Sequence, residues 1–263
     1  MPTFAANLTM MFTEYPFLDR FRAAAEAGFR HVEYLFPYEH PAGVLKAKLD
    51  EHGLTQVLFN TSPGDPARGE WGLAALPGRE TEARELIGQA LDYARVLACP
   101  QVHVMAGVVP DGVGREACFD TFVDNVRHAA DTFRPHGVKV MLEALSPQGK
   151  PGYLLKSQHD ALAAVEAVDR DNVFMQFDYF HAQNVDGNLS RMTEAMIRRI
   201  GHVQIASVPD RHEPDEGEVD YAHVFALLDR LGYEGYVGCE YNPRGRTEDG
   251  LGWLKTLMNR SGA

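Results

Sequence analysis

The sequence predicts one α/β domain over residues 1–263, a closed (β/α)₈ barrel of parallel strands. The first observation is that eight short apolar segments alternate with eight segments of helical periodicity, a pattern typical of parallel sheets. The second is that the composition does not change along the chain, whose 263 residues, 45% of them hydrophobic, suffice for one barrel. The third is that residues 7–10, after the first predicted strand, lack the glycine-rich turn of a doubly wound nucleotide-binding sheet.

The predicted strands are short runs of apolar residues. They cover residues 4–7, 31–35, 55–59, 101–105, 138–143, the stretch 172–181, 202–206 and 236–240. The predicted helices repeat apolar residues at helical spacing, and Gly28 and Gly53 follow the first two of them as stop signals. They cover residues 16–27, 44–51, 79–97, 115–133, 158–168, 189–200, 221–231 and 250–258.

The segment 60–78 interrupts this alternation. It is rich in glycine and proline, has no clear periodicity, and is long for a connector within a compact domain. We therefore predict that it forms a functional lid, with Trp71 as its anchor.

Charge and composition exclude several kinds of partner. The net charge of −12 argues against nucleic acid or an anionic membrane as the main partner. The chain shows neither a signal peptide nor a run of about 18 apolar residues, so we expect a cytoplasmic protein. Its cysteines, Cys99, Cys118 and Cys239, form no CxxC motif and are expected to be reduced. The sequence leaves the oligomeric state open, a homo-oligomer included.

An oxygen-bearing side chain stands near the C-terminal end of each of the last four predicted strands. Active sites of such barrels lie at this rim. Three carboxylates crowded there would repel one another unless a cation intervened. A set with oxygen ligands and no cysteine or histidine favours Mg²⁺ or Mn²⁺ over Zn²⁺. Each acid alone could pair with a nearby arginine or lysine, but the recurrence at equivalent places favours one shared site. The four residues are Glu143, Asp178, Gln204 and Glu240.

Further polar residues surround the predicted rim. His181 and Arg211 lie just past the sixth and seventh strands, where together they could orient an anionic or hydroxylated substrate. Because side chains alternate along a strand, His202 would face the same interior as the rim oxygens. Glu33 is expected in a buried hydrogen-bonded network, and His103 as a core histidine with its hydrogen bonds satisfied. Most of the acidic segment 208–220 is expected to be a solvated loop.

Five segments of the chain resemble the hydroxypyruvate isomerase family. They are FAANLTMMFTEYPFLDRF, HVEYLFPY, LPGRE, HVQIASVPDRHEPDEGEVDY and YVGCEYNP. The resemblance implies a xylose-isomerase-like TIM barrel that isomerises a small hydroxy-oxo acid, hydroxypyruvate, to 2-hydroxy-3-oxopropanoate (tartronate semialdehyde). It also implies that Glu143 and Glu240 transfer protons and that His181 and Arg211 contact the substrate. The positions that match metal ligands of the wider family are Glu143, Asp178, Gln204 and Glu240.

The chain departs from the family pattern at two places. Residues 64–66 read Gly-Asp-Pro and residues 70–72 read Glu-Trp-Gly, where family members carry GDW and ERG. The lid contacts are therefore not carried over. Residues 205–209 read Ile-Ala-Ser-Val-Pro, where the family's isomerase has Ala-Asp-Asn-Pro. This second departure lies close to the expected substrate and leaves open an activity on the four-carbon acid 2-oxo-tetronate (2-dehydrotetronate).

The expected chemistry moves a proton between adjacent carbons through an enediolate. One carboxylate would remove the proton from C3 and the other would return one at C2. A divalent ion would stabilise the developing charge, and Arg211 would hold the substrate carboxylate. Which of Glu143 and Glu240 serves which carbon stays open.

Three other functions compete with this one. A ketose 3-epimerase could use the same pair of glutamates on a single carbon. A metal-dependent endonuclease is disfavoured by the net charge of −12 and by the absence of histidine from the four predicted ligands. A barrel that only binds sugar acids would not need the intact pair of Glu143 and Glu240.

Overall fold

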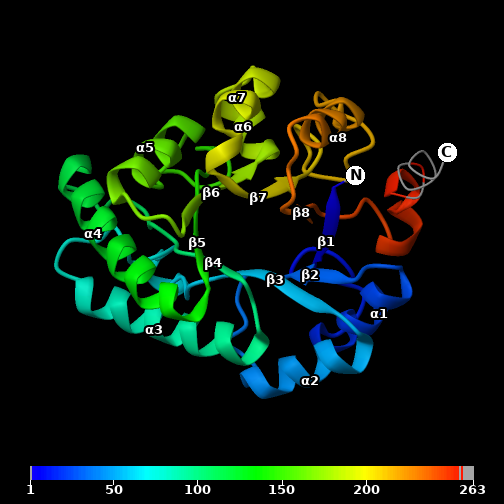
Figure 1. Ribbon diagram of the computed structural model, residues 1–263, viewed down its shortest axis with the longest axis horizontal. Helices are drawn as coiled ribbons and strands as arrows, with labels where there is room; N and C mark the ends of the chain where they lie inside the picture. Colours follow the sequence, from blue (N-terminus) through cyan, green and yellow to red (C-terminus); the bar gives the residue numbers. More distant parts are fainter. Residues whose placement is uncertain (1, 255, 257–263) are drawn as a thin grey trace.

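A closed barrel of eight parallel strands forms the centre of the protein, and the predicted fold class is confirmed. The computed structural model describes residues 2–254 and 256. The strands follow one another around the barrel in chain order, and β1 pairs with β8 to close it (Figure 1). They are β1 (Thr3–Asn7), β2 (His31–Glu33), β3 (Thr55–Asn60), β4 (Gln101–His103), β5 (Lys139–Glu143), β6 (Val173–Asp178), β7 (Ile200–Ile205) and β8 (Tyr236–Cys239).

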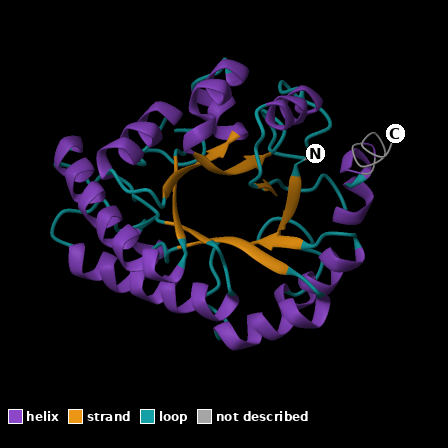
Figure 2. Ribbon diagram, viewed as in Figure 1, coloured by secondary structure: helices purple, strands orange, loops and turns teal. Residues whose placement is uncertain are grey.

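Helices surround this ring of strands on the outside (Figure 2). None of the helices in the described residues is long and apolar enough to cross a membrane. The α-helices are α1 (Arg20–Glu26), α2 (Ala42–His52), α3 (Glu80–Leu97), α4 (Arg115–Phe133), α5 (Gln158–Val168), α6 (Tyr179–Val185), α7 (Leu189–Met196) and α8 (Tyr221–Arg230). The predicted tail helix, residues 250–258, is helical at residues 252–254 and 256, and its remaining positions 255, 257 and 258 lie outside the described residues.

The structure corrects the prediction for the stretch 172–181. It is predicted as a strand with Asp178 at its C-terminal end and His181 just past it. The strand β6 does end at Asp178, but the residues that follow form the helix α6 from Tyr179, which the sequence did not predict. The Phe180 backbone N–H donates a hydrogen bond of 2.8 Å to Asp178 Oδ1, so the acid caps this helix. His181 therefore lies in the first turn of a helix and not in a loop.

A large apolar core lies between the barrel and its helices, and a smaller cluster lies apart from it. The smaller cluster contains Met141, which stands two residues before Glu143 on the same face of β5. On β5, this cluster therefore lies one inward-facing position below Glu143. Its buried members are Ala5, Val57, Leu58 and Met141, with Phe174 and Tyr236 packed against them.

A buried hydrogen-bonded layer centred on Glu33 lies next to the rim. Glu33 Oε1 accepts from Asn7 Nδ2 at 3.0 Å and from Gln204 Nε2 at 2.8 Å. Glu33 Oε2 lies 2.7 Å from His202 Nε2. Gly238 makes room for this carboxylate, because a Cβ at that position would collide with it. Glu33 is thus a member of a satisfied buried network, as predicted.

Candidate active site

A cavity of about 210 Å³ lies at the carboxyl ends of the strands. Four of the six predicted site residues line it, and they come from four different strand ends or the elements that follow them. These four are Glu143, His181, Arg211 and Glu240. The arrangement matches the rim position at which (β/α)₈ barrels carry their active sites.

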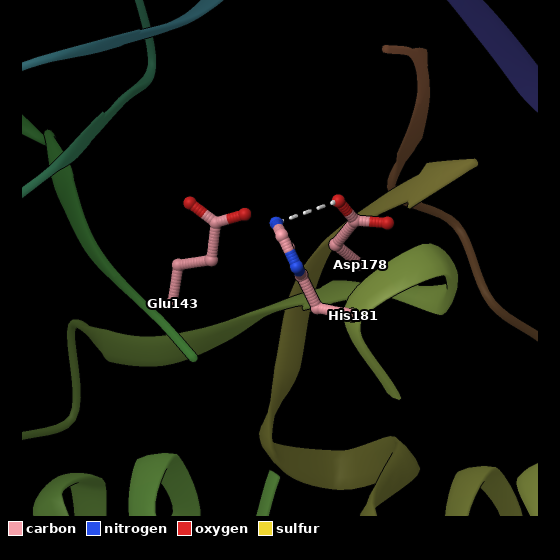
Figure 3. Close-up of side chains that lie close together, drawn as sticks. All are labelled: Glu143, Asp178 and His181. Carbon is pink, nitrogen blue, oxygen red and sulfur yellow. Dashed lines mark ion pairs between the residues drawn. The ribbon is translucent and has the colours of Figure 1, made fainter. Parts of the chain in front are cut away.

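Glu143, Asp178 and His181 converge at one side of this cavity. One potential ligand atom from each residue lies within 4.8 Å of the others, and Figure 3 shows the imidazole between the two carboxylates. All three side chains are buried. Asp178 Oδ1 is used to cap α6, whereas Asp178 Oδ2 has no hydrogen-bond partner. A buried carboxylate oxygen without a partner is costly, so this atom is suited to a cation or to a donor on the substrate.

The hydrogen bonds of His181 determine which ring nitrogen carries its proton. The Ser146 backbone N–H donates to His181 Nδ1 at 3.1 Å, so Nδ1 accepts and the neutral ring is protonated at Nε2. Burial lowers the pKa of His181 to about 4, which keeps the ring neutral at pH 7. His181 Nε2 lies 3.6 Å from Asp178 Oδ2. His181 thus offers an N–H beside that oxygen and is better suited to donate to a substrate oxygen than to ligate a metal.

The guanidinium of Arg211 pairs with two of the acids. Arg211 Nη2 lies 2.5 Å from Glu240 Oε2 and 3.6 Å from Asp178 Oδ2. The guanidinium also lies over the Phe180 ring, 4.9 Å from its centroid. Its backbone, at a φ of 57°, is held by the Asn242 N–H, which donates to the Arg211 carbonyl at 2.8 Å. Arg211 therefore orients Glu240 and offsets part of the negative charge of the site.

Both glutamates of the cavity have raised pKa values. Burial is the largest cause for Glu143, and the charges of Glu240 and Asp178 raise its pKa further. Burial also raises the pKa of Glu240, against the opposing effect of Arg211. Carboxyl groups whose pKa is raised toward neutrality can take up and release protons at physiological pH.

The predicted ligand Gln204 is turned away from the cavity. Its Oε1 accepts from Gln176 Nε2 at 2.7 Å, and its Nε2 donates to Glu33. The buried acids and the unpartnered Asp178 Oδ2 fit a hard divalent cation. This fit rests on Glu143, Asp178 and Glu240, and Gln204 would have to exchange its present hydrogen bonds to join them.

His103 is the main residue that sequence reasoning misplaced. It is predicted as a satisfied core histidine, but it lines the cavity and both of its ring nitrogens lack a hydrogen-bond partner. His103 Nδ1 lies 3.5 Å from Glu143 Oε2, and burial lowers the pKa of the ring to about 3. Asn60, which also lines the cavity, has an unpartnered buried Oδ1. The sequence does contain a signal for these two residues, because Asn60 and His103 are polar and stand at the carboxyl ends of β3 and β4.

Trp71, the predicted anchor of the lid, forms part of the cavity wall. Its ring packs against Phe36 at a centroid distance of 5.9 Å. The next residue, Gly72, has a φ of 110°, and a Cβ there would lie 2.6 Å from the Met105 carbonyl oxygen. Only glycine allows this close approach, which fixes the lid segment to the loop after β4 at this point.

Comparison with known proteins agrees with this fold. The family model described as "Xylose isomerase-like TIM barrel" matches residues 21–257. The 2-oxo-tetronate isomerase of Haemophilus influenzae is 62% identical over 255 residues, which cover 97% of this chain and 99% of that protein. The hydroxypyruvate isomerase of Escherichia coli is 39% identical over 254 residues, covering 97% and 98% respectively. The crystal structure described as "AP endonuclease, family 2" from Brucella melitensis matches with a TM-score of 0.96 at 54% identity, covering 97% of this chain and 99% of that one.

The closed barrel and the match to the family model place the chain in the class of xylose isomerase-like TIM barrels. Within that class, the chain belongs to the family of hydroxypyruvate and 2-oxo-tetronate isomerases. It is therefore an isomerase of a small molecule, which confirms the family resemblance and the enzyme class predicted from the sequence.

Proposed function

We propose that this isomerase interconverts 2-oxo-tetronate and its 3-oxo isomer by transferring a proton between C2 and C3. The relatives at 62%, 60% and 51% identity are all named 2-oxo-tetronate isomerase, which supports the four-carbon acid as the substrate. Hydroxypyruvate is the second candidate, because the relative named hydroxypyruvate isomerase is 39% identical. These similarities reverse the order of the two substrates expected from the sequence alone. The net charge of −12 disfavours duplex DNA as a substrate.

The observation that carries the proposal is that Glu143 and Glu240 line one small cavity and both have raised pKa values. One carboxylate removes the proton at C3 of the 2-oxo acid, and the other group, as a carboxylic acid, delivers a proton to C2 of the enediolate, while the hydroxyl proton passes from O3 to O2. His181 Nε2–H donates to a substrate oxygen on which negative charge develops. Arg211 holds Glu240 in the orientation that this transfer requires.

The proposal includes a divalent cation, Mg²⁺ or Mn²⁺. Glu143 and Asp178, whose ligand atoms already lie close together, would hold it with Glu240, which is paired with Arg211. Gln204 would join them only after its amide leaves Gln176 and Glu33. When bound, the cation would act as a Lewis acid toward the substrate oxygens and lower the energy of the enediolate.

The test is a comparison of kcat/KM on 2-oxo-tetronate, hydroxypyruvate and a ketohexose at equal Mg²⁺ concentration. We expect the highest value for 2-oxo-tetronate and a lower one for hydroxypyruvate. Glu143→Gln and Glu240→Gln should each lose roughly 10²- to 10⁴-fold in rate, the usual cost of removing a general base. A ketohexose as the best substrate would replace the proposal with a ketose 3-epimerase. No turnover of any of the three would favour a barrel that only binds sugar acids.

A further inference from the structure

Lys150 is a cation of the cavity wall that is not paired with an acid. It lines the cavity together with Glu143 and Glu240. Its Nζ lies 4.2 Å from the centroid of the Trp71 ring. Among residues 2–254 and 256, no carboxylate forms an ion pair with it. Arg211, in contrast, is already 2.5 Å from Glu240 and 3.6 Å from Asp178. The uncommitted positive charge of the cavity is therefore on Lys150.

The turn that carries Lys150 also positions His181. The backbone N–H groups of Gly149 and Lys150 both donate to the Ser146 carbonyl at 2.9 Å. The Ser146 N–H donates to His181 Nδ1, and a Cβ at Gly149 would lie 2.8 Å from His181 Cε1. This tight packing fixes the turn against the imidazole. Lys150 thus has a defined place beside the reacting groups, although its side chain is partly exposed.

The Trp71 ring contacts the Lys150 side chain and limits its movement. Lys150 comes from the loop after β5, and Trp71 comes from the lid segment after β3, so their contact joins two separate loops across the cavity wall. A cation over the face of an indole ring is attracted by the ring while its other N–H groups stay available. The pair therefore presents a held ammonium group to a ligand in the cavity.

We propose that Lys150 binds the carboxylate of the substrate and makes this site selective for sugar acids over neutral ketoses. The inference rests on the proposed function, because a 2-oxo acid brings a carboxylate directly beside its reacting carbonyl. A further anion in a cavity with three buried acids needs its own counter-charge. Arg211 has an unpartnered Nε–H, but its positive charge is already shared with Glu240 and Asp178. The sequence predicts that Arg211 holds the substrate carboxylate, whereas in this proposal Lys150 holds it.

The test compares Lys150→Met, Lys150→Arg and Lys156→Met with the wild-type protein. Lys156 is an exposed lysine of the same loop and controls for the lost charge. The substrates are 2-oxo-tetronate and erythrulose, which has the same four carbons but a hydroxymethyl group in place of the carboxylate. Lys150→Met should raise KM for the acid by roughly 10- to 100-fold, the usual value of a hydrogen bond to a charged group, with a smaller change in kcat. Activity on erythrulose should stay unchanged, Lys150→Arg should recover most of the loss, and Lys156→Met should behave as wild type.

A binding measurement separates this inference from the proposed function. Calorimetry with erythronate, a four-carbon hydroxy acid without the oxo group, should show a similar loss of affinity in Lys150→Met. If the acid is turned over and neither its KM nor the erythronate affinity changes in Lys150→Met, the inference is wrong and the proposed function stands. If no acid is turned over, the proposed function fails. The erythronate affinities then test by themselves whether Lys150 binds a carboxylate. Failure of wild-type protein to bind erythronate would also overturn the assignment of Lys150.

Discussion

The backbone N–H of Ser146 lies 3.1 Å from His181 Nδ1 and donates a hydrogen bond to it. This contact ties the loop after β5 to the first turn of α6. It also fixes the proton of the neutral imidazole on Nε2, the nitrogen nearest to Asp178 Oδ2. One backbone hydrogen bond thus determines what His181 offers to a substrate.

The first prediction concerns the protonation of His181. Because burial lowers its pKa to about 4, the ring should remain neutral and protonated at Nε2 from pH 8 down to pH 5. Long-range ¹H–¹⁵N spectra of the imidazole groups, assigned with a His181→Gln variant, provide the measurement. A titration near pH 6.5, or a signal from the Nδ1–H tautomer, would contradict the assignment of His181 as an Nε2–H donor.

The second prediction concerns the metal. We expect Asp178→Asn to weaken Mn²⁺ binding and activity together, because it removes charge from a buried oxygen that has no hydrogen-bond partner. The fold should survive, since asparagine also caps helices and can replace the hydrogen bond to the Phe180 N–H. Calorimetric Mn²⁺ titration and the thermal midpoint are compared with those of Glu218→Gln, an exposed acid of the 208–220 segment. Unchanged Mn²⁺ affinity would remove Asp178 from the ligand set.

The third prediction concerns His103 and the dependence of stability on pH. Its pKa is about 3 in the folded protein and about 6.5 when exposed, so the unfolded state binds more protons between these values. The contribution of His103 to stability is present above pH 6.5 and is lost as the pH falls toward 3. The free energy of unfolding should therefore decline less steeply in His103→Gln than in the wild-type protein over this range. Urea titrations at pH 7, 6, 5 and 4 measure the slope, and equal slopes would show that His103 is not a buried neutral group.

The fourth prediction concerns the lid segment. Trp71 is half-buried in the cavity wall, and we expect a bound substrate analogue to shield it further. Trp253 is the other tryptophan of the chain and packs in the core beside Phe4, so Trp253→Phe leaves Trp71 as the reporter. Iodide quenching of this variant should decrease when erythronate is added. Equal quenching with and without the ligand would show that the segment is a fixed wall.

The fold and the positions of the rim acids could be predicted because both depend on local sequence patterns. A short apolar strand that ends in Glu143 or Asp178 identifies the strand and the rim residue at once. Closure of the barrel then places these strand ends at one rim, so no other sequence pattern is needed to predict that they meet. The same rule also identifies Asn60 and His103, at the ends of β3 and β4, as rim residues.

The pairings within the site could not be predicted, since they join residues far apart in the sequence. Arg211 meets Glu240 from a different loop, and Gln204 is held by Glu33, 171 residues away. The helix α6 was missed because the aromatic residues after Asp178 are as typical of a strand as those before it. Only the hydrogen bond from the Phe180 N–H to Asp178 shows where the strand ends.

The fifth prediction tests the central claim, that Glu143 and Glu240 transfer protons at different carbons. Each Glu→Gln change keeps the shape and an oxygen atom of the side chain but removes the base. Both variants should lose net isomerisation of 2-oxo-tetronate, by roughly 10²- to 10⁴-fold. Their exchange reactions should differ, because the base that serves C3 can still act when the other one is lost.

The most direct measurement follows deuterium uptake at C3 of 2-oxo-tetronate by NMR, for both variants in D₂O with Mg²⁺. The account predicts that one variant still incorporates deuterium at C3 at a measurable rate while the other does not. Equal incorporation by both variants, or near-normal turnover by either, would contradict the account and leave a single carboxylate to carry the proton between the two carbons.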